Sequence, residues 1–408
     1  MNICGVICEL NPFHNGHEYL FREAKRITDS DRLIAVMSGD FVQRGIPAVC
    51  DKYTRCRMAL LGGADLVLEL PTIYSTASAD YFAFGAVSLL NNLGCVDFLC
   101  FGSETGDILK LKKTAKNYFS DVTGPHILSQ GTGADSFSGR NAGESFAKAF
   151  SRQVGDKISS NDMLALCYIR SLKLLASDIE AVAVKRVGAD YLDVSEDSGS
   201  ATAIRRKIYE GKDYGGHIPD YALKALKRAE FDSFPINIDD FSIQLNTRMN
   251  TILRNEDRLK EYLTDYMDVS QNIAGRIRNN IYDFTTYDDF ITSVHSKEYT
   301  KSRVMRALTH ILLNVRKSDY PENIDQCQVG YARILGFRRE SSDLLSEIKE
   351  KSLVPVISKA KDAQSFLDDD VKPVFDIDTY AANVYEQACA FKFKNKPVHD
   401  FSKEIVIV

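Results

Sequence analysis

Two histidines lie three residues apart near the start of the chain, in the run NPFHNGH at residues 11–17. The run joins an apolar stretch to a segment with helical spacing, where Pro12 restricts the turn and Gly16 lets a ligand approach the backbone. The free N–H groups and positive dipole end of such a helix attract phosphate. Imidazoles there can donate hydrogen bonds to polyphosphate oxygens and stabilise charge that develops at an α-phosphate. Phosphate chemistry is therefore one interpretation, with His14 and His17 as the catalytic residues.

Two other interpretations of these histidines remain open at this stage. Asn15 could cap an ordinary helix, which would leave both imidazoles on the surface without a function. Alternatively, His14 and His17 would share one helix face and could bind zinc. Zinc needs a third protein ligand, however, and no nearby Cys, Asp or Glu stands at a recognisable spacing. We therefore predict no metal site.

A second run with phosphate-binding residue types is SATAIRR at residues 200–206. The hydroxyls of Ser200 and Thr202 and the guanidinium of Arg205 can contact the oxygens of a leaving pyrophosphate. The same residues also fit a simple helix start, with Ser200 as the N-cap and the arginines in solvent. Paired with the histidine run, this segment becomes a second contact to a triphosphate.

Both runs lie within a regular alternation of predicted strands and helices. Apolar runs predict strands at Ile3–Cys8, Leu33–Met37, Asp65–Leu70, Val96–Phe101 and Ala181–Val187. Helical spacing predicts helices at Gly16–Ile27, Lys52–Leu61, Ser75–Leu93, Asn161–Ala176 and Ala201–Glu210. The alternation predicts an α/β fold with a Rossmann-like, doubly wound parallel sheet. Ligands of such sheets bind beyond the carboxyl ends of the strands, where NPFHNGH would lie.

The composition changes twice along the chain. Residues 123–143 are rich in Gly, Ser, Thr and His, which predicts a loop or a lid inserted in the α/β domain. After Gly211 the strand rhythm stops, and residues 215–219 (GGHIP) have the composition of a junction. We therefore predict a catalytic, ATP-binding α/β domain at residues 1–214 and a mainly helical domain at residues 215–408.

The overall composition is that of a folded, soluble protein. The 408 residues are 44% hydrophobic and 26% charged, and the net charge of −5 argues against wholesale coating of nucleic acid. The nine cysteines are odd in number and form no CxxC pair, which favours reduced core residues. No run approaches the roughly 20 apolar residues of a membrane helix, and the first residues do not resemble a signal peptide. We expect a cytoplasmic protein.

The run His14-Asn15-Gly16-His17 matches the HxGH signature of the nucleotidyltransferase superfamily that includes class I aminoacyl-tRNA synthetases. Further motifs are MSGDFVQRG at 37–45, LELP at 68–71, FGSE at 101–104 and SNDML at 160–164. Together with CELNPFHNGH at 8–17, this set resembles the bacterial tRNA(Met) cytidine acetate ligase family. The resemblance covers residues 1–210 and continues more weakly to the C-terminus.

The resemblance implies an activity. Members of the family activate acetate with ATP to acetyl-adenylate and transfer the acetyl group to N4 of the wobble cytidine in elongator tRNA(Met), forming N4-acetylcytidine. The implied partners are ATP, acetate and this tRNA, with Mg as a possible companion of ATP; no membrane is implied and no oligomeric state is predicted. The residues alone lead only to adenylate chemistry. A small-molecule nucleotidyltransferase that adenylates a cofactor precursor, and a catalytically silent RNA-binding protein, are therefore the alternatives.

The resemblance also implies which residues bind ATP. The N-terminal segment that carries over consists of Ile7, Cys8, Glu9, Leu10, Asn11, Pro12, Phe13, His14, Asn15, Gly16, His17, Glu18, Tyr19 and Leu20. Further along the chain the resemblance adds Gly102, Asn161, Arg186 and Val187. Without it, Gly102 would be a strand-end turn, Asn161 a helix cap and Arg186 a surface charge.

The helical half contains one strongly basic segment, KEYTKSRVMRALTHILLNVRK at residues 297–317. Its apolar residues form the buried stripe of a helix, while Arg303, Arg306 and His310 share another face. With a tRNA substrate, this face predicts phosphate contacts by Arg303 and Arg306. Without one, it is the solvated side of an amphipathic helix.

Other charged residues near the predicted rim of the sheet are harder to assign. Asp40, Gln43 and Arg44 follow the second predicted strand, and they either orient a substrate or belong to a solvated loop. Lys52 and Arg55 are expected as charges on a helix surface.

Overall fold

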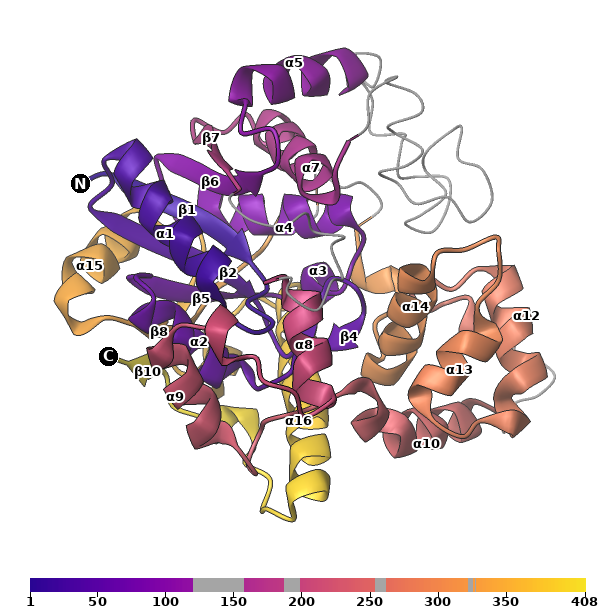
Figure 1. Ribbon diagram of the computed structural model, residues 1–408. Helices are drawn as coiled ribbons and strands as arrows, with labels where there is room; N and C mark the ends of the chain where they lie inside the picture. The colour runs from indigo at the N-terminus through magenta and orange to yellow at the C-terminus, as the bar shows by residue number, and fades with distance from the viewer. Residues whose placement is uncertain (120–157, 187–198, 254–261, 322–325, 327) are drawn as a thin grey trace.

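A computed structural model describes residues 1–119, 158–186, 199–253, 262–321, 326 and 328–408 (Figure 1). At its centre, strands lie in the order β10-β8-β5-β2-β1-β6-β7, with helices on both faces. β1 (Ile3–Cys8) pairs in parallel with β2 (Arg32–Ser38) and with β6 (Phe98–Ser103). β5 (Leu66–Leu70) pairs in parallel with β2, and β7 (Glu180–Lys185) pairs in parallel with β6. The predicted α/β fold with a doubly wound parallel sheet is confirmed.

The strand order puts the topological switch point at β1. From β1 the chain runs through β2 to β5 on one side, and then crosses to β6 and β7 on the other side. The edge beyond the carboxyl ends of β1 and β6 is therefore where a doubly wound sheet binds its ligand. All five predicted strands are present, displaced by a residue or two at their ends.

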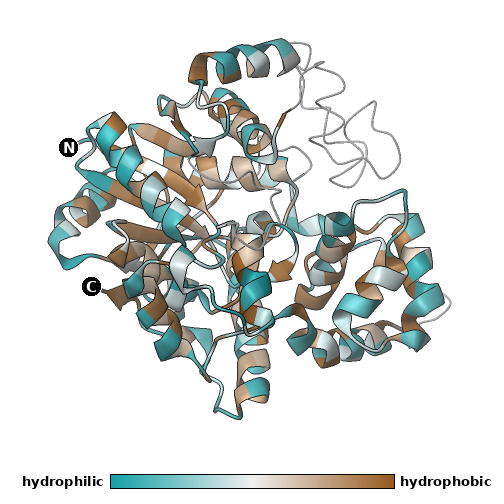
Figure 2. Cartoon of the chain, in the orientation of Figure 1, coloured by the Kyte–Doolittle hydropathy of each residue, from teal (hydrophilic) through white to brown (hydrophobic). Residues whose placement is uncertain are grey.

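The side chains of β1 alternate between two hydrophobic cores. Ile7 belongs to the core under α4 (Ala79–Asn92) and α7 (Ser160–Leu174), whereas Val6 belongs to the core that contains buried side chains of α1 (Asn15–Thr28). A strand covered by helices on both faces is mainly apolar, and most residues of the central strands are hydrophobic (Figure 2).

The predicted helices of the first half are present with one exception, and the helix at Ile108–Phe119 was not predicted. α2 (Lys52–Leu61) coincides with its prediction, and α5 (Ile108–Phe119) and α8 (Ala201–Tyr209) complete this half. The predicted helix Ser75–Leu93 is instead divided into α3 (Thr72–Ser75) and α4. The hydroxyl of Thr76 donates to the carbonyl of Thr72 at 2.7 Å, and such local bonds compete with continued helix.

The second half of the chain is helical at first and then returns to the sheet. Its helices are α9 (Asp220–Ala229), α10 (Ser242–Leu253), α12 (Gln271–Asn280), α13 (Tyr287–Val294), α14 (Lys301–Leu313), α15 (Ser342–Lys351) and α16 (Lys372–Phe393). β8 (Ala332–Phe337) pairs antiparallel to β5, and β10 (Val406–Ile407) pairs parallel to β8. The predicted division at residues 214 and 215 did not anticipate these strands, because a single six-residue strand and a two-residue strand are too short for their period to stand out.

Short elements complete the described chain. β3 (Phe41–Val42) and β4 (Ile46–Pro47) form a small hairpin, and β9 (Val356–Ile357) pairs with β8. The 3-10 helices of the described chain include η2 (Gly215–His217), η3 (Ile238–Phe241), η5 (Ile281–Asp283) and η10 (Asp400–Ser402).

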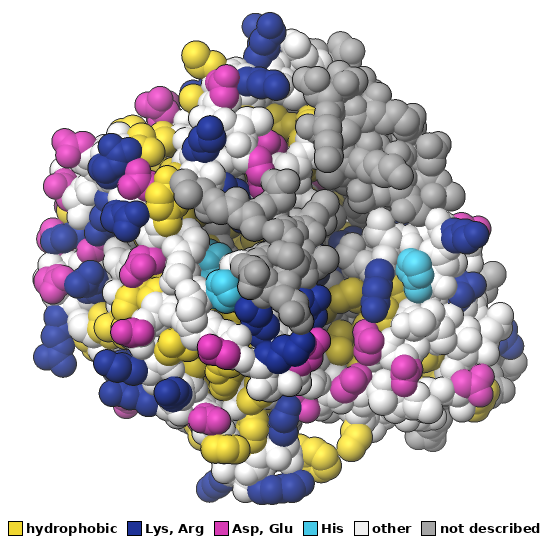
Figure 3. Space-filling model, in the orientation of Figure 1, with side chains coloured by type: hydrophobic (Ala, Val, Ile, Leu, Met, Phe, Trp, Pro, Cys, Tyr) yellow, Lys and Arg dark blue, Asp and Glu magenta, His cyan; other side chains and the backbone are white. Residues whose placement is uncertain are grey.

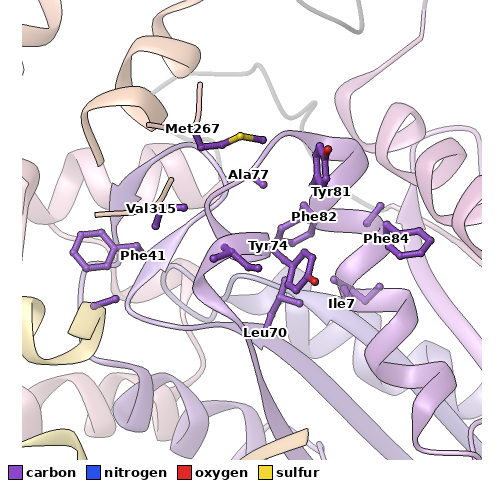
Figure 4. Close-up of a cluster of buried hydrophobic side chains, with 14 of the residues drawn as sticks. Ile7, Phe41, Leu70, Tyr74, Ala77, Tyr81, Phe82, Phe84, Met267 and Val315 are labelled. Carbon is purple, nitrogen blue, oxygen red and sulfur yellow. The ribbon is translucent and has the colours of Figure 1, made fainter. Parts of the chain in front are cut away.

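The helical half shares its core with the α/β half. Met267 and Val315 lie with Phe41 and Tyr74 in one cluster of buried side chains (Figure 4). One hydrophobic cluster continues across both halves, and α14 packs directly on β4, which follows β2.

A buried cluster of four charged side chains holds the C-terminal segment on the sheet. Lys52 Nζ lies 2.8 Å from Glu69 and 3.2 Å from Asp400, and Arg333 lies 3.2 Å from Glu69 and 2.8 Å from Asp400. Two positive and two negative groups balance, which a buried ionic cluster requires. The prediction that Lys52 is a helix-surface charge is therefore wrong.

Arg55 is also buried, contrary to its prediction as a surface charge. Its guanidinium donates at 2.9 Å to the carbonyls of Glu9 and Ser38 and also to that of Gly39, while Nε donates to Cys50 at 3.1 Å. These carbonyls lie where β1 and β2 end, so Arg55 satisfies backbone acceptors that the sheet leaves unpaired.

Candidate active site

The predicted site residues meet at the carboxyl ends of three neighbouring strands. β1 pairs with β6, and β6 pairs with β7 up to Ser103 and Lys185. The N-termini of α1, α7 and α8 lie at the same edge of the sheet (Figure 1). Three helix N-termini direct backbone N–H groups and partial positive charge to one edge, which suits an anion.

His14 and His17 cap the N-terminus of α1 for one another. His14 is the N-cap, and its Nδ1 atom accepts from the backbone N–H of Gly16 at 3.0 Å. His17 Nδ1 accepts from the backbone N–H of His14 at 3.2 Å, which completes a capping box. The cap is therefore His14 and not Asn15, the residue considered from the sequence.

This capping arrangement decides where the imidazole protons lie. A backbone N–H can only donate, so Nδ1 of each ring carries a lone pair and the proton of each neutral ring lies on Nε2. Both Nε2–H groups are then donors that the helix cap does not use. The ring centres of His14 and His17 are 3.8 Å apart, so the two donors lie side by side.

Both histidines are held in the neutral form. Burial, together with the positive charges of Arg186 and Arg205, lowers the pKa of His14 to about 3. The pKa of His17 lies well below its usual value because of burial and because of the neighbouring His14. At neutral pH the pair supplies two directed donors, and the positive charge of the site comes from the arginines.

Gly16 and Phe13 fix the cap from two sides. A Cβ atom on Gly16 would lie 2.9 Å from Cε1 of His14, so a side chain there would displace the imidazole. Phe13 is buried, and its ring lies 5.7 Å from the rings of both His17 and Phe21.

The second predicted phosphate element reaches the first one. Arg205 donates to the carbonyl of Asn11 at 2.6 Å and to Thr202 Oγ1 at 3.2 Å. Ser200 caps α8 by accepting from the N–H of Ala203 at 3.3 Å, as one sequence interpretation had it. The start of α8 therefore lies against the loop before α1, although the two are nearly two hundred residues apart.

A carboxylate joins the remaining predicted ATP-binding residues. Glu104 accepts from Asn161 Nδ2 at 2.6 Å and from the hydroxyl of Ser159, and it lies 3.6 Å from Arg186 Nε. The side chain of Arg186 lies against Gly102, because a Cβ atom on Gly102 would be 3.4 Å from Cγ of Arg186. Ser159 and not Asn161 caps α7, which leaves the Asn161 amide bound to Glu104.

Sequence reasoning gave Glu104 no role. The signal was present in the FGSE motif, which places a carboxylate directly after a strand at the rim of the sheet. Its partners come from the end of β7 and the start of α7, and only folding brings these to the end of β6.

Most of the segment from Ile7 to Leu20 has structural side-chain partners. Ile7, Cys8, Leu10, Asn11, Pro12 and Phe13 are buried. Glu9 accepts from the N–H of Gln43 at 3.0 Å, and Glu18 accepts from the hydroxyl of Tyr221 at 2.8 Å. Asn15 is exposed, while Tyr19 and Leu20 are half-buried on α1. Contacts of the buried residues with a ligand would have to come from the backbone.

Two predicted features lie outside the described residues, namely Val187 and the proposed lid at 123–143.

Two polar residues that follow β2 have structural partners. Asp40 accepts from the N–H of Lys52 at 2.7 Å, and burial raises its pKa to about 7. Gln43 links Glu9 to the carbonyl of Ala77, so it connects the site to the start of α4.

Arg303 and Arg306 do not form the exposed basic face predicted for them. Both are buried, and Arg306 makes a bidentate pair with Asp268 at 2.8 and 3.1 Å. Arg303 Nε donates to the carbonyl of Asp268, and its guanidinium lies 4.8 Å from the ring of Tyr299. His310 on the same face is fully buried. The helix packs with this face inward because Asp268 supplies a buried counter-charge, which the helical period does not reveal.

Within the described part of the chain, no group of three or more His, Cys, Asp or Glu side chains could hold a metal ion. A search of the same residues finds no helix with the length and apolarity to cross a membrane.

The chain matches the model of the HIGH Nucleotidyl Transferase family over residues 1–400. It belongs to that family. The capped histidine pair of this nucleotidyltransferase lies in the HxGH run at residues 14–17.

Relatives of this nucleotidyltransferase narrow the assignment. The tRNA(Met) cytidine acetate ligase of Clostridium perfringens (strain SM101) is 37% identical over 403 residues, which cover 94% of this chain and 95% of the relative. That of Clostridium tetani is 36% identical, with complete coverage of both chains. The resemblance seen in the sequence is confirmed, and the chain belongs to the tRNA(Met) cytidine acetate ligase family.

A solved structure agrees with this assignment. The crystal structure of Thermotoga maritima TmcAL bound with alpha-thio ATP is similar over the full length of both chains, with a TM-score of 0.85 and 27% identity. An apo form of the same protein gives a TM-score of 0.84.

Proposed function

We propose that this chain is an ATP-dependent ligase that activates acetate as acetyl-adenylate and transfers the acetyl group to N4 of the wobble cytidine of elongator tRNA(Met). The observation that carries the proposal is the pair of neutral, mutually capped histidines beside Arg186 and Arg205. The names of the relatives supply the acceptor, and the site supplies the adenylate chemistry. Such an enzyme acts where tRNA is found, and we place it in the cytoplasm.

The residues at the strand ends fit a nucleoside triphosphate. Two Nε2–H donors, two guanidinium groups and the N-terminus of α1 provide hydrogen bonds and positive charge for phosphate oxygens. Gly102 presents backbone at the end of β6, where an adenosine would lie flat, with Asn161 and Arg186 beside it. Mg could accompany the phosphates, with water and phosphate oxygens as its ligands.

In the first step, a carboxylate oxygen of acetate attacks the α-phosphorus and forms a new P–O bond. The bond from the α-phosphorus to the bridging oxygen breaks, and pyrophosphate leaves with that electron pair. His14 and His17 donate to oxygens on which charge increases, while Arg205 and Thr202 face the leaving pyrophosphate. Positioning and electrostatics are sufficient here, so no covalent enzyme intermediate is needed.

In the second step, the N4 amine of cytidine attacks the acetyl carbonyl of the mixed anhydride. A C–N bond forms, the bond from carbonyl carbon to phosphate oxygen breaks, and AMP leaves. The amine loses one proton in this step, which a base or solvent must accept.

Acetate-dependent exchange of labelled pyrophosphate into ATP tests the first step, and mapping of acetylated nucleosides in tRNA tests the second. We expect exchange only with acetate, N4-acetylcytidine only in tRNA(Met), and loss of both in His17→Ala. Tyr282→Ala, which changes an exposed side chain on η5, is the matched control. Pyrophosphate release with a phosphate-bearing small molecule in place of acetate would instead assign a cofactor nucleotidyltransferase, and absence of adenylate under all conditions would leave an RNA-binding protein.

A further inference from the structure

Because Arg303 and Arg306 are buried, the RNA substrate must contact another surface of the chain. A candidate surface starts at the C-terminal end of α8. Arg205 in α8 donates to the carbonyl of Asn11, in the loop that leads to His14. From there α8 extends about 14 Å along its axis. On its exposed side lie Arg206 and, just beyond the helix, Lys212, whose side chains are 42% and 54% exposed. Figure 3 shows Lys and Arg side chains gathered in the region of α8, close to histidine side chains on the same face.

The surface continues from α8 to the end of α16 through specific hydrogen bonds. The hydroxyl of Tyr209, at the end of α8, donates to the carbonyl of Ile236 at 3.0 Å. Asn395, after α16, donates to the carbonyl of Phe231 at 2.8 Å. The segment 231–236 therefore bridges the two helix ends, and side chains from all three segments share one strip of surface.

Aromatic side chains on this strip are exposed beside cations. Phe231 and Phe391 are 72% and 63% exposed, the most exposed phenylalanines of the described residues, and Tyr209 is 44% exposed. Lys394 Nζ lies 4.5 Å from the centre of the Phe391 ring. Exposure of a phenylalanine ring to water is unfavourable, whereas stacking of the ring on an unpaired base is favourable. Neighbouring cations can contact the phosphates between such bases.

We propose that this strip, formed by Arg206, Tyr209, Lys212, Phe231, Phe391 and Lys394, binds the RNA substrate. The inference rests on the proposed function, because that function requires an RNA whose reacting cytidine reaches His14 and His17. The N-terminus of α8 lies against the loop that carries these histidines. Glu210 lies 4.0 Å from Arg206 and 3.0 Å from Lys212, and Asp232 lies beside Phe231 and accepts from Asn395 at 3.3 Å. These two carboxylates reduce the positive charge of Arg206, Lys212 and Lys394 without cancelling it. RNA fits better than a protein partner, because Lys394 lies over the exposed ring of Phe391, and lysine is depleted from the centres of protein interfaces.

Two pairs of substitutions in the full-length chain test the strip. Phe231→Ala with Phe391→Ala removes stacking, and Lys212→Gln with Lys394→Gln removes phosphate contacts. The matched control is Tyr282→Ala with Lys349→Gln, an exposed aromatic and an exposed lysine on other parts of the surface. All side chains concerned are exposed, so thermal unfolding should stay unchanged in each variant.

The measurements are the Kd for an elongator tRNA(Met) transcript over a range of salt, and acetate-dependent ATP–pyrophosphate exchange. We expect the phenylalanine pair to weaken binding about tenfold or more. The lysine pair should lower the slope of log Kd against log salt by about one to two. Exchange should remain at the wild-type rate in all three variants.

Strip variants that bind this tRNA as tightly as the control would overturn the inference, and so would a control that weakens equally. Failure of the proposed function has a different signature, because wild-type protein would then show no acetate-dependent exchange. If the strip variants of such a protein still lost RNA binding, the result would support the inference that the strip binds RNA.

Discussion

The Nδ1 atom of His17 accepts the backbone N–H of His14 at 3.2 Å, so one imidazole caps the helix that begins at the other. The same bond forces the ring proton onto Nε2, where it can serve phosphate chemistry. The capping role, which looked like an alternative to a catalytic role in the sequence, is therefore compatible with the catalytic role that we propose for the same two residues.

Exchange of His17 for glutamine separates these roles. A glutamine at this third helical position can still accept the N-cap N–H, so the free energy of unfolding should change by less than about 1 kcal/mol. The imidazole donor is lost, and the rate of acetyl-adenylate formation should fall about a hundredfold to a thousandfold. Urea unfolding and single-turnover adenylate assays measure the two effects. Adenylate formation at the wild-type rate would remove His17 from the chemistry.

Acidification should destabilise the fold through the histidine pair. The pKa of His14 is about 3 in the folded chain against 6.5 as its ordinary value, so below pH 6.5 the unfolded chain binds a proton that the folded chain does not. The free energy of unfolding therefore falls as the pH falls from 6.5. Because His14 is half-buried, its contribution should be less than about 1.4 kcal/mol per pH unit.

His14→Asn provides the comparison for this pH dependence. Asparagine is a good N-cap and does not titrate, so the variant should lose less stability than the wild type between about pH 7.5 and pH 5.5. Urea denaturation at both pH values measures the difference. Identical losses in the two proteins would show that His14 titrates normally in the fold.

Glu104 should act by positioning Arg186 and not by touching the reacting atoms. Glu104→Gln keeps an acceptor for Asn161 but removes the charge that faces Arg186 at 3.6 Å. We expect the KM for ATP to rise about tenfold, the equivalent of about 1.4 kcal/mol, with a smaller effect on kcat.

A double-mutant cycle of Glu104→Gln with Arg186→Ala tests this coupling. The double variant should lose little more than Arg186→Ala alone, because the two residues share one interaction. Fully additive losses in kcat/KM would mean that Glu104 acts elsewhere.

Arg306 should matter for stability and not for RNA binding. Arg306→Met leaves the buried carboxylate of Asp268 without its bidentate partner, which should cost about 3–5 kcal/mol in the free energy of unfolding. Binding of tRNA at a temperature where the variant is folded should be unchanged. Weaker tRNA binding with unchanged stability would restore the surface role predicted from the sequence.

The sequence was most informative where the pattern is local. The strand β1 and the extent of α2 follow from apolar runs and helical spacing, which neighbouring residues along the chain determine. The HxGH run and the accompanying motifs were likewise sufficient for the family and its chemistry.

The sequence was least informative where a charged side chain has a distant partner. Lys52, Arg55 and Arg306 have the periodicity of surface charges, but each is buried against groups from other segments. A helical period shows which residues share a face, and it does not show whether that face meets water or a buried carboxylate.

The sequence by itself determined the α/β alternation, the histidine pair and the membership of a family that makes adenylates. Only the tertiary structure decided that Arg205 reaches the loop at Asn11, and that Glu104 joins Asn161 to Arg186. It also decided that the chain returns to complete the sheet with β8 and β10. The physical reason is that hydrogen bonds and ion pairs depend on distance in space, and chain separation does not encode this distance.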